Sequence, residues 1–270
     1  MNALYSLAAL LTLSDPAWAD AITPAALDLT ATYGGADVVV LGEVHDNPIH
    51  HENQARALAA LAPKALVFEM LPPGVVMPET HADAEDLASA LGWNASGWPD
   101  FSMYYPIFTA APKARIYGAE VGRDQARQAF ADGIAAIFGP DAAAYGLTTP
   151  LPAADQSARE AEQAQAHCNA LPPDLLPGMV DVQRLRDATL ARAVVQALAD
   201  TGGPVAVITG TGHARRDQGL PAALALAAPD TKVLSIGQFE EAPEPGAPFD
   251  LWLITDPHPR EDPCKAFTGG

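Results

Sequence analysis

Three short segments of the chain carry histidines and carboxylates that could do chemistry. The segment GEVHDN holds Glu43 and His45 two residues apart, and Glu69 directly follows an apolar run further along the chain. The segment GTGHARRD then contributes His213. Carboxylates and imidazoles that converge from separate segments are what a metal centre or a general acid–base site requires. The candidate metal ligands are therefore Glu43, His45, Glu69 and His213.

The spacing of these groups limits which of them can face one ligand. Glu43 and His45 project to the same side of an extended segment because they are two residues apart. His51 lies about 100° around a helix from His50, so these two can hardly face one ligand. Taken singly, His50 and His51 are each typical of a solvated helix position. Taken singly, Glu43 and Glu69 are each typical of a helix cap or of an ion-pair partner. The conjunction of three such segments is what favours a functional cleft.

Six β-rich runs provide the elements that must position these groups. Each run is mostly apolar without regular alternation, which is typical of strands buried on both faces. Helical patterns separate most of them, and this alternation predicts an α/β fold with a mostly parallel sheet flanked by helices. Since ligands bind beyond the carboxyl ends of parallel strands, the three chemistry-bearing segments should meet at one edge. The six runs are Asp37–Gly42, Ala65–Met70, Ala114–Ala119, Pro204–Gly210, Lys232–Gly237 and Phe249–Thr255.

The helical patterns predict one domain over residues 20–270 with two helical insertions. Asp46 or Asn47 can cap a first helix in which Pro48 occupies the first turn. Residues 71–112, rich in aromatic residues, proline and glycine, are predicted to form an inserted helical lid. Residues 123–200 form the second insertion, with a helical hairpin over Gln156–Asn169 and Met179–Ala199.

The first 19 residues predict export of the protein. An apolar run from Leu4 to Leu13 is shorter than the roughly 20 residues that span a bilayer, and Ala17-Trp18-Ala19 fits a cleavage site. We therefore expect a signal peptide over residues 1–19 and a periplasmic protein without a lipid anchor. The alternative is an apolar helix packed on the core. The two cysteines, Cys168 and Cys264, could pair in an oxidising periplasm or remain free thiols.

The charge of the chain bears on its partners. Fifteen basic residues against 33 acidic ones leave a formal net charge of −18. This charge disfavours binding to nucleic acid and to anionic lipid surfaces. A transporter or receptor of the cell envelope that meets this protein should offer a basic face.

Four motifs together resemble the ChaN-like haem-binding proteins of the Tiki superfamily, which also includes erythromycin esterases and metal-dependent peptidases. The motifs are LGEVHDNPIHHENQ at 41–54, VFEM at 67–70, QRLRDATLA at 183–191 and TGTGHARRDQGLP at 209–221. The resemblance implies an α/β fold, a role in bacterial haem or iron acquisition, and haem held at the interface of a homodimer. By position, the four candidate ligands resemble the polar cleft of the superfamily. Two departures are expected to matter. Many relatives are lipoproteins, whereas no anchoring cysteine follows the apolar run here, and relatives commonly have Asn where Thr211 stands and Met where Leu190 stands.

The resemblance does not fix the haem ligand, so we infer a candidate from the chemistry of the residues. A tyrosine oxygen favours ferric haem, and the aromatic segment 98–108 is apolar enough to shelter a porphyrin. We predict Tyr105 as the iron ligand and Tyr104 as the second choice. Arg215 and Arg216 are the cations nearest the cleft for the propionates, and His51 is a further candidate contact.

Three hypotheses about function follow. The leading one is a periplasmic haem-binding protein that stores haem or passes it onward without chemical turnover. The second is a hydrolase in which the four candidate ligands bind a divalent metal, or act as acid and base without one. The third is an inert descendant whose cleft stabilises the fold. A flat apolar slot would favour haem, and an open polar cleft would favour hydrolysis.

Overall fold

The computed structural model describes residues 20–262, 264 and 265. The predicted signal peptide, residues 1–19, lies outside these residues. Within the described ranges no helix combines the length and the apolar character needed to cross a membrane.

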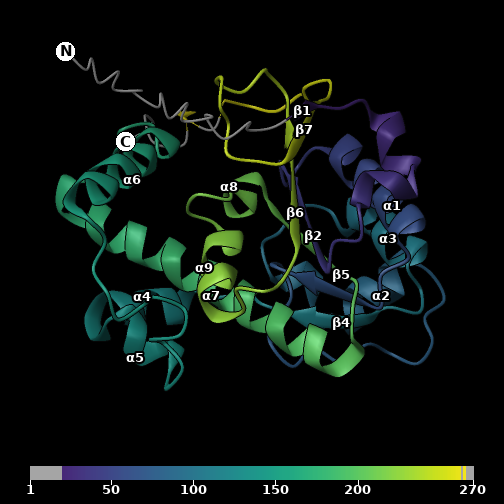
Figure 1. Ribbon diagram of the computed structural model, residues 1–270, viewed down its shortest axis with the longest axis horizontal. Coiled ribbons are helices and arrows are strands. Elements are labelled where there is room, and N and C mark those ends of the chain that lie inside the picture. Colours follow the sequence, from purple (N-terminus) through teal and green to yellow (C-terminus); the bar gives the residue numbers. More distant parts are fainter. Residues whose placement is uncertain (1–19, 263, 266–270) are drawn as a thin grey trace, which may run out of the picture.

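A seven-stranded sheet forms the centre of the molecule (Figure 1). All strand pairs are parallel, in the order β1-β7-β6-β2-β5-β3-β4. The six predicted strands are confirmed, and each of their ends lies within two residues of the prediction. The two-residue β1 is too short to leave a sequence pattern. The strands are β1 Asp20–Ala21, β2 Val38–Glu43, β3 Ala65–Phe68, β4 Arg115–Gly118, β5 Val205–Gly210, β6 Val233–Phe239 and β7 Leu251–Ile254.

Helices cover both faces of the sheet, with α1–α3 on one face and α7–α9 on the other (Figure 1). Helices α4–α6 contact α7 and lie to the left of the sheet in Figure 1. The α-helices are α1 Pro48–Leu61, α2 Ala84–Ala90, α3 Phe101–Ala110, α4 Arg123–Asp132, α5 Ile134–Phe138, α6 Ala153–Ala166, α7 Leu176–Thr201, α8 Thr211–Ala214 and α9 Leu220–Ala227. The 3₁₀ helices are η1 Pro24–Asp28, η2 Thr30–Tyr33, η3 Trp93–Ala95 and η4 Pro173–Leu175.

Alternate residues of each central strand belong to two different cores. In β2, Val38 and Val40 pack with α7 and α9, whereas Val39 and Leu41 pack with α1 and α3. Both faces are covered, so a continuous apolar run is the pattern that such a strand needs. This explains why the predicted strands could be recognised from composition without alternation.

The register of the central strands places the chemistry-bearing segments at one edge. Glu43, at the end of β2, pairs with Gly210, at the end of β5, and Glu69 follows directly after β3 on the other side of β5. Close packing at this edge requires Gly42, because a Cβ there would lie 2.9 Å from Thr211 Oγ1.

The predicted lid over residues 71–112 forms part of the core. Helices α2 and α3 pack in the layer of α1, and Trp93, Phe101 and Tyr104 are buried there. Phe101, Tyr104 and Phe108 recur at helical spacing, so they present one apolar face to α1. The segment is therefore a structural layer, and its loop at Trp98 is the part that reaches the site.

A disulfide joins Cys168, just after α6, to Cys264 near the end of the chain. The two Cα atoms are 5.6 Å apart, and 96 residues separate them in sequence. Arg260 fixes the same terminal segment by ion pairs to Glu240 and Asp46, at 2.6 and 2.8 Å. Pairing of the two cysteines, one of the two alternatives left open by the sequence, is thus the one observed.

Candidate functional site

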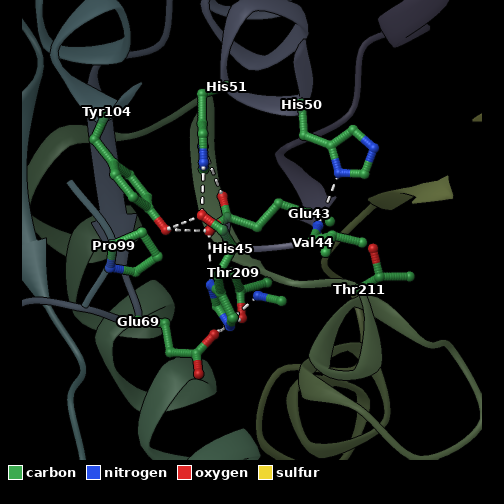
Figure 2. A network of polar contacts seen from close by, with 12 residues as sticks. Glu43, Val44, His45, His50, His51, Glu69, Pro99, Tyr104, Thr209 and Thr211 are labelled. Atoms are coloured by element: carbon green, nitrogen blue, oxygen red, sulfur yellow. Dashed lines mark hydrogen bonds and ion pairs between the residues drawn. The ribbon is translucent and has the colours of Figure 1, made fainter. Parts of the chain in front are cut away.

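The four predicted site residues lie together at the carboxyl edge of the sheet. Figure 2 shows three of them, Glu43, His45 and Glu69. His45 Nδ1 is 2.8 Å from Glu43 Oε1, and His213 Nε2 is 3.6 Å from Glu69 Oε1. His45 lies between the two carboxylates, close enough for both to act on its charge. The predicted convergence of three distant segments on one pocket is therefore what the structure shows.

The Glu43 carboxylate is the centre of this network and is closed to solvent. Its Oε1 accepts hydrogen bonds from His45 Nδ1 at 2.8 Å and from the Tyr104 hydroxyl at 2.7 Å. Its Oε2 accepts from Gln54 Nε2 at 2.7 Å and faces His51 Nδ1 at 3.4 Å. Burial alone would raise the pKa of Glu43, but hydrogen bonds from His45 and His51 hold it well below its usual range. Glu43 is thus a buried anion with four donors around it.

The geometry around His51 requires a doubly protonated ring. Its Nε2 donates to the His45 carbonyl at 2.9 Å, and its Nδ1 faces both Gln54 Oε1 and Glu43 Oε2. The Gln54 amide nitrogen donates to Leu41 O and Glu43, so its oxygen is the atom turned toward His51. Both ring nitrogens therefore face acceptors. Burial opposes this charge, but the hydrogen bond to Glu43 raises the pKa of His51 above its usual value.

His50 is neutral, and it fixes the turn that leads into α1. Its Nδ1 accepts from the Val44 backbone N–H at 2.8 Å, so Nε2 carries the proton and donates to Thr255 Oγ1 at 2.8 Å. Burial lowers the pKa of His50 to about 4. Because His50 and His51 are both completely buried, the interpretation of either one as a solvated helix residue is wrong.

His213 is held by an aspartate that sequence reasoning missed. Asp187, in α7, accepts a hydrogen bond of 2.7 Å from His213 Nδ1. Burial on its own would lower the pKa of His213, but the charges of Glu69 and Asp187 outweigh it and raise the pKa to about 9. Asp187 stands inside the quoted motif QRLRDATLA, on an apolar helix face, and this position was the signal that could have revealed it.

Glu69 uses one carboxylate oxygen for structure and directs the other toward His213. Its Oε2 accepts from Thr209 Oγ1 at 2.7 Å and from the Gly210 N–H at 2.9 Å. Burial alone would raise the pKa of Glu69, but the charges of His213 and His45 lower it. Gly210 is needed here because a Cβ would lie 2.9 Å from His45 Nε2.

The predicted divalent metal finds no support in this arrangement. Both oxygens of Glu43 and one oxygen of Glu69 are already occupied by donors. Among the described residues, no group of three or more His, Cys, Asp or Glu side chains could hold a metal ion.

Two cavities meet at the site. The large cavity, of about 820 Å³, lies between the ends of β2 and β5 and the helices α6 and α7. The small cavity, of about 390 Å³, is bounded by the ends of β3 and β4, the loop at Trp98, and α7. His45, Gln183 and His213 line both, so each histidine can present a side chain to either cavity.

Comparison with known proteins identifies the family. Residues 29–224 match the family described as "Haem-binding uptake, Tiki superfamily, ChaN". The chain belongs to this family. The match contains all four predicted site residues and every residue that lines the two cavities.

The solved structures show how far the fold of this ChaN-family protein is shared. ChaN of Campylobacter jejuni, solved in a study of cofacial haem binding, is 18% identical and covers 82% of this chain and 89% of its own. Its TM-score of 0.62 shows a common fold. The type III effector HopBA1 matches at 12% identity over 84% of this chain and 92% of its own, with a TM-score of 0.42. Among curated proteins, none matches the chain significantly.

The predicted tyrosines line neither cavity of this ChaN-family protein. Tyr104 is fully buried, and burial together with the charge of Glu43 raises its pKa, so the ring stays a neutral donor. This geometry gives no support to Tyr104 as an iron ligand. Tyr105 is half-buried on the outer side of α3, with its ring 6.2 Å from that of His81 and 6.3 Å from that of Phe101. Its role as an iron ligand stays a prediction.

The three other predicted haem contacts differ in their access. Arg215 lines the large cavity but is already paired with Asp217 at 2.7 Å and with Glu162 at 3.1 Å. Arg216 pairs with Asp250 at 2.6 Å and lines neither of the two cavities. His51 is buried beneath Glu43, where a ligand cannot touch it. Sequence reasoning missed Arg159, which lines the large cavity from α6.

Replacing Tyr104 by phenylalanine is expected to lower the free energy of unfolding by about 2 kcal/mol, because a buried carboxylate loses a hydroxyl donor. Urea denaturation of the purified variant measures the change. Tyr105→Phe is the matched control, since Tyr105 is only half-buried, and a change within about 0.5 kcal/mol is expected. Equal losses in the two variants would contradict the anchoring role given to Tyr104.

Proposed function

We propose that this protein binds haem as cargo in the large cavity and passes it onward without chemical turnover. The observation that carries this proposal is the family match over residues 29–224, which describes haem-binding uptake proteins. The cavity volume of about 820 Å³ supports it, because pockets for small molecules and cofactors occupy roughly 300–1,000 Å³. The side chains of Val44, Ala166 and Val180 give part of the wall an apolar surface, and Arg159 offers a cation for a propionate.

His45 is the iron ligand that we propose in this cavity. Its side chain is 32% exposed, and its Nδ1 is engaged by Glu43, which leaves Nε2 as the atom available for a ligand. A carboxylate behind a histidine fixes the ring and increases its basicity toward a metal, and histidine is a common haem ligand. His213 has the same arrangement with Asp187, but only 13% of its side chain is exposed.

The proposed location is the periplasm. The disulfide between Cys168 and Cys264 supports it, because disulfides persist in oxidising compartments. The formal charge of −18 supports a basic docking face on the envelope transporter or receptor that takes the haem. A homodimer that holds haem at its interface remains part of the same proposal.

Titration of the purified protein with haemin, followed by its absorption spectrum, tests haem binding. We expect a shifted Soret band at saturation, and His45→Ala should change that band and weaken binding at least about tenfold, as loss of an iron ligand requires. His81→Ala is the control, because His81 is exposed and lines neither cavity. If Tyr105→Phe alters the spectrum and His45→Ala does not, the ligand is Tyr105. If the wild-type protein does not shift the Soret band of haemin, the haem proposal is wrong.

The Asp187–His213 pair favours acid–base hydrolysis as a second candidate function. An aspartate that orients a histidine through Nδ1 is an arrangement that general bases use, and Glu69 faces the opposite nitrogen. Turnover of a chromogenic ester by the haem-free protein, abolished in His213→Gln, would support this candidate. Absence of turnover together with haem binding would leave the first proposal standing alone.

A further inference from the structure

Two arginines on the wall of the small cavity indicate a second binding site. Arg123 begins α4 and Arg186 lies within α7, so two separate helices bring guanidinium groups to one cavity. We propose that the small cavity binds the carboxylate group of a small molecule between Arg123 and Arg186. This site is distinct from the large cavity, and its existence does not depend on haem binding there.

Neither arginine is neutralised by an acidic side chain in the described part of the chain. Arg123 makes no ion pair there, and Arg186 makes one hydrogen bond, of 3.4 Å, to Gln183 Oε1. The chain has 33 acidic and only 15 basic residues, yet four of its arginines form no ion pair among the described residues. These are Arg123, Arg159, Arg186 and Arg192. The arginines that do form ion pairs are Arg56, Arg115, Arg127, Arg184, Arg215, Arg216 and Arg260.

The wall between the arginines suits a planar ligand. A Cβ on Gly97 would lie 3.5 Å from Arg123 Nη2, so this guanidinium rests against the loop that carries Trp98. The Trp98 ring lines the same cavity and lies 4.9 Å from the His45 ring. A guanidinium binds a carboxylate through two parallel hydrogen bonds, and an indole ring packs against a flat apolar body. The volume of about 390 Å³ admits a molecule of this kind.

The acidic residues of the cavity select for a single negative charge. Glu69 and Glu120 line the same wall as the two arginines. The charge of Glu69 is countered by His213, so Glu120 leaves the two arginines with one net positive charge. One carboxylate neutralises this charge, whereas the second charge of a phosphate would exceed it. The geometry therefore favours a carboxylate over a phosphate.

Calorimetric titration of the full-length, haem-free protein with benzoate tests the proposal. Benzoate should bind saturably, and the neutral isostere benzamide should bind at least about tenfold more weakly, because it cannot pair with the guanidiniums. The double variant Arg123→Gln, Arg186→Gln should lose at least about tenfold in benzoate affinity. Arg127→Gln is the matched control: Arg127 lies on the same helix, is exposed, pairs with Asp124 and does not line the cavity, so affinity should stay within about twofold. Unchanged unfolding temperatures of these variants would show that the arginines act on the ligand and not on the fold.

Three results would overturn the proposal: no binding of benzoate, equal binding by the double variant, or tighter binding of inorganic phosphate. The carboxylate could belong to a haem propionate or to a separate small molecule, and haem dimethyl ester distinguishes them. If the ester binds more weakly than haem, and the double variant binds haem more weakly than the wild type, the carboxylate in the small cavity is a haem propionate. If neither esterification of haem nor the double substitution affects haem binding, the carboxylate belongs to a separate small molecule. If benzoate binds but titration with haemin shifts no Soret band, the haem proposal is wrong and this proposal stands. If haemin shifts the Soret band but benzoate does not bind, this proposal is wrong and the haem proposal stands.

Discussion

Replacing Glu43 by glutamine is expected to lower the free energy of unfolding by about 3–5 kcal/mol, the cost of leaving a buried charge without its partner. Glutamine has nearly the same shape, so the loss would come from electrostatics and not from a cavity. The ring of His51, protonated at both nitrogens, would remain buried without a counter-ion. The new amide would also turn an N–H₂ group toward donors on His45, Tyr104 or Gln54.

Chemical denaturation of wild type and Glu43→Gln measures this change. Asp124→Asn is the matched control, because it also removes one carboxylate charge from an ion pair, but at an exposed position on α4. The control should change stability by no more than about 0.5 kcal/mol. A double variant with His51→Gln should lose less than the two single losses combined, since the uncompensated cation is then gone. A loss below about 1 kcal/mol in Glu43→Gln would show that the carboxylate does not stabilise a charged His51.

The sheet and the meeting of its chemistry-bearing ends were predictable because their signals are local in the sequence. A strand buried on both faces needs a continuous apolar run, and parallel strands must deliver their carboxyl ends to one edge. Glu43, Glu69 and His213 each follow such a run, so their convergence followed from the pattern alone.

The partners that tune these groups could not be predicted, because they depend on which helix face turns inward. Asp187 reaches His213 from 26 residues away along the chain, and no spacing rule connects a residue within α7 to one in α8. Taken singly, His51 is typical of a solvated helix position, and the sequence also offers it as a candidate haem contact. Its burial becomes understandable only once Glu43 is known to be an anion that needs donors.

The aromatic segment 98–108 was predicted to bind a ligand, but its Tyr104 packs beneath the site instead. Tyr104 and Tyr105 are adjacent and chemically identical, so only the helical spacing of Tyr104 with Phe101 and Phe108 separates them. In the helix they point about 100° apart, which sends Tyr104 inward to Glu43 and leaves Tyr105 at the outer side. The hydroxyl of Tyr104 thereby ties α3 to the end of β2 and helps to hold the carboxylate that orients His45. The aromatic residues near the site thus pack beneath it and support its carboxylate.

Replacing both Cys168 and Cys264 by serine is expected to lower the free energy of unfolding by about 4 kcal/mol. The disulfide closes a loop across 96 residues, and in the chain-entropy account a loop of about 100 residues contributes about 4.7 kcal/mol by restricting the unfolded state. Reduction of the wild type with a phosphine should produce the same loss, whereas the double variant should not respond to the reductant. This comparison separates the cross-link from any effect of the serines themselves.

The position of the bond adds a consequence for the large cavity. Cys168 follows α6, the helix that supplies Arg159 and Ala166 to the cavity wall, and Cys264 anchors it to a segment that Arg260 holds against Asp46 and Glu240. Without the bond, α6 is held by its packing on α7 and by the polar contacts of Glu162 with Arg215 and Gln218. Its amide hydrogens should therefore exchange faster in the reduced protein, while those of β2 and β5 stay protected. If reduction leaves both the unfolding midpoint and the exchange of α6 unchanged, the bond restricts neither the unfolded chain nor this wall.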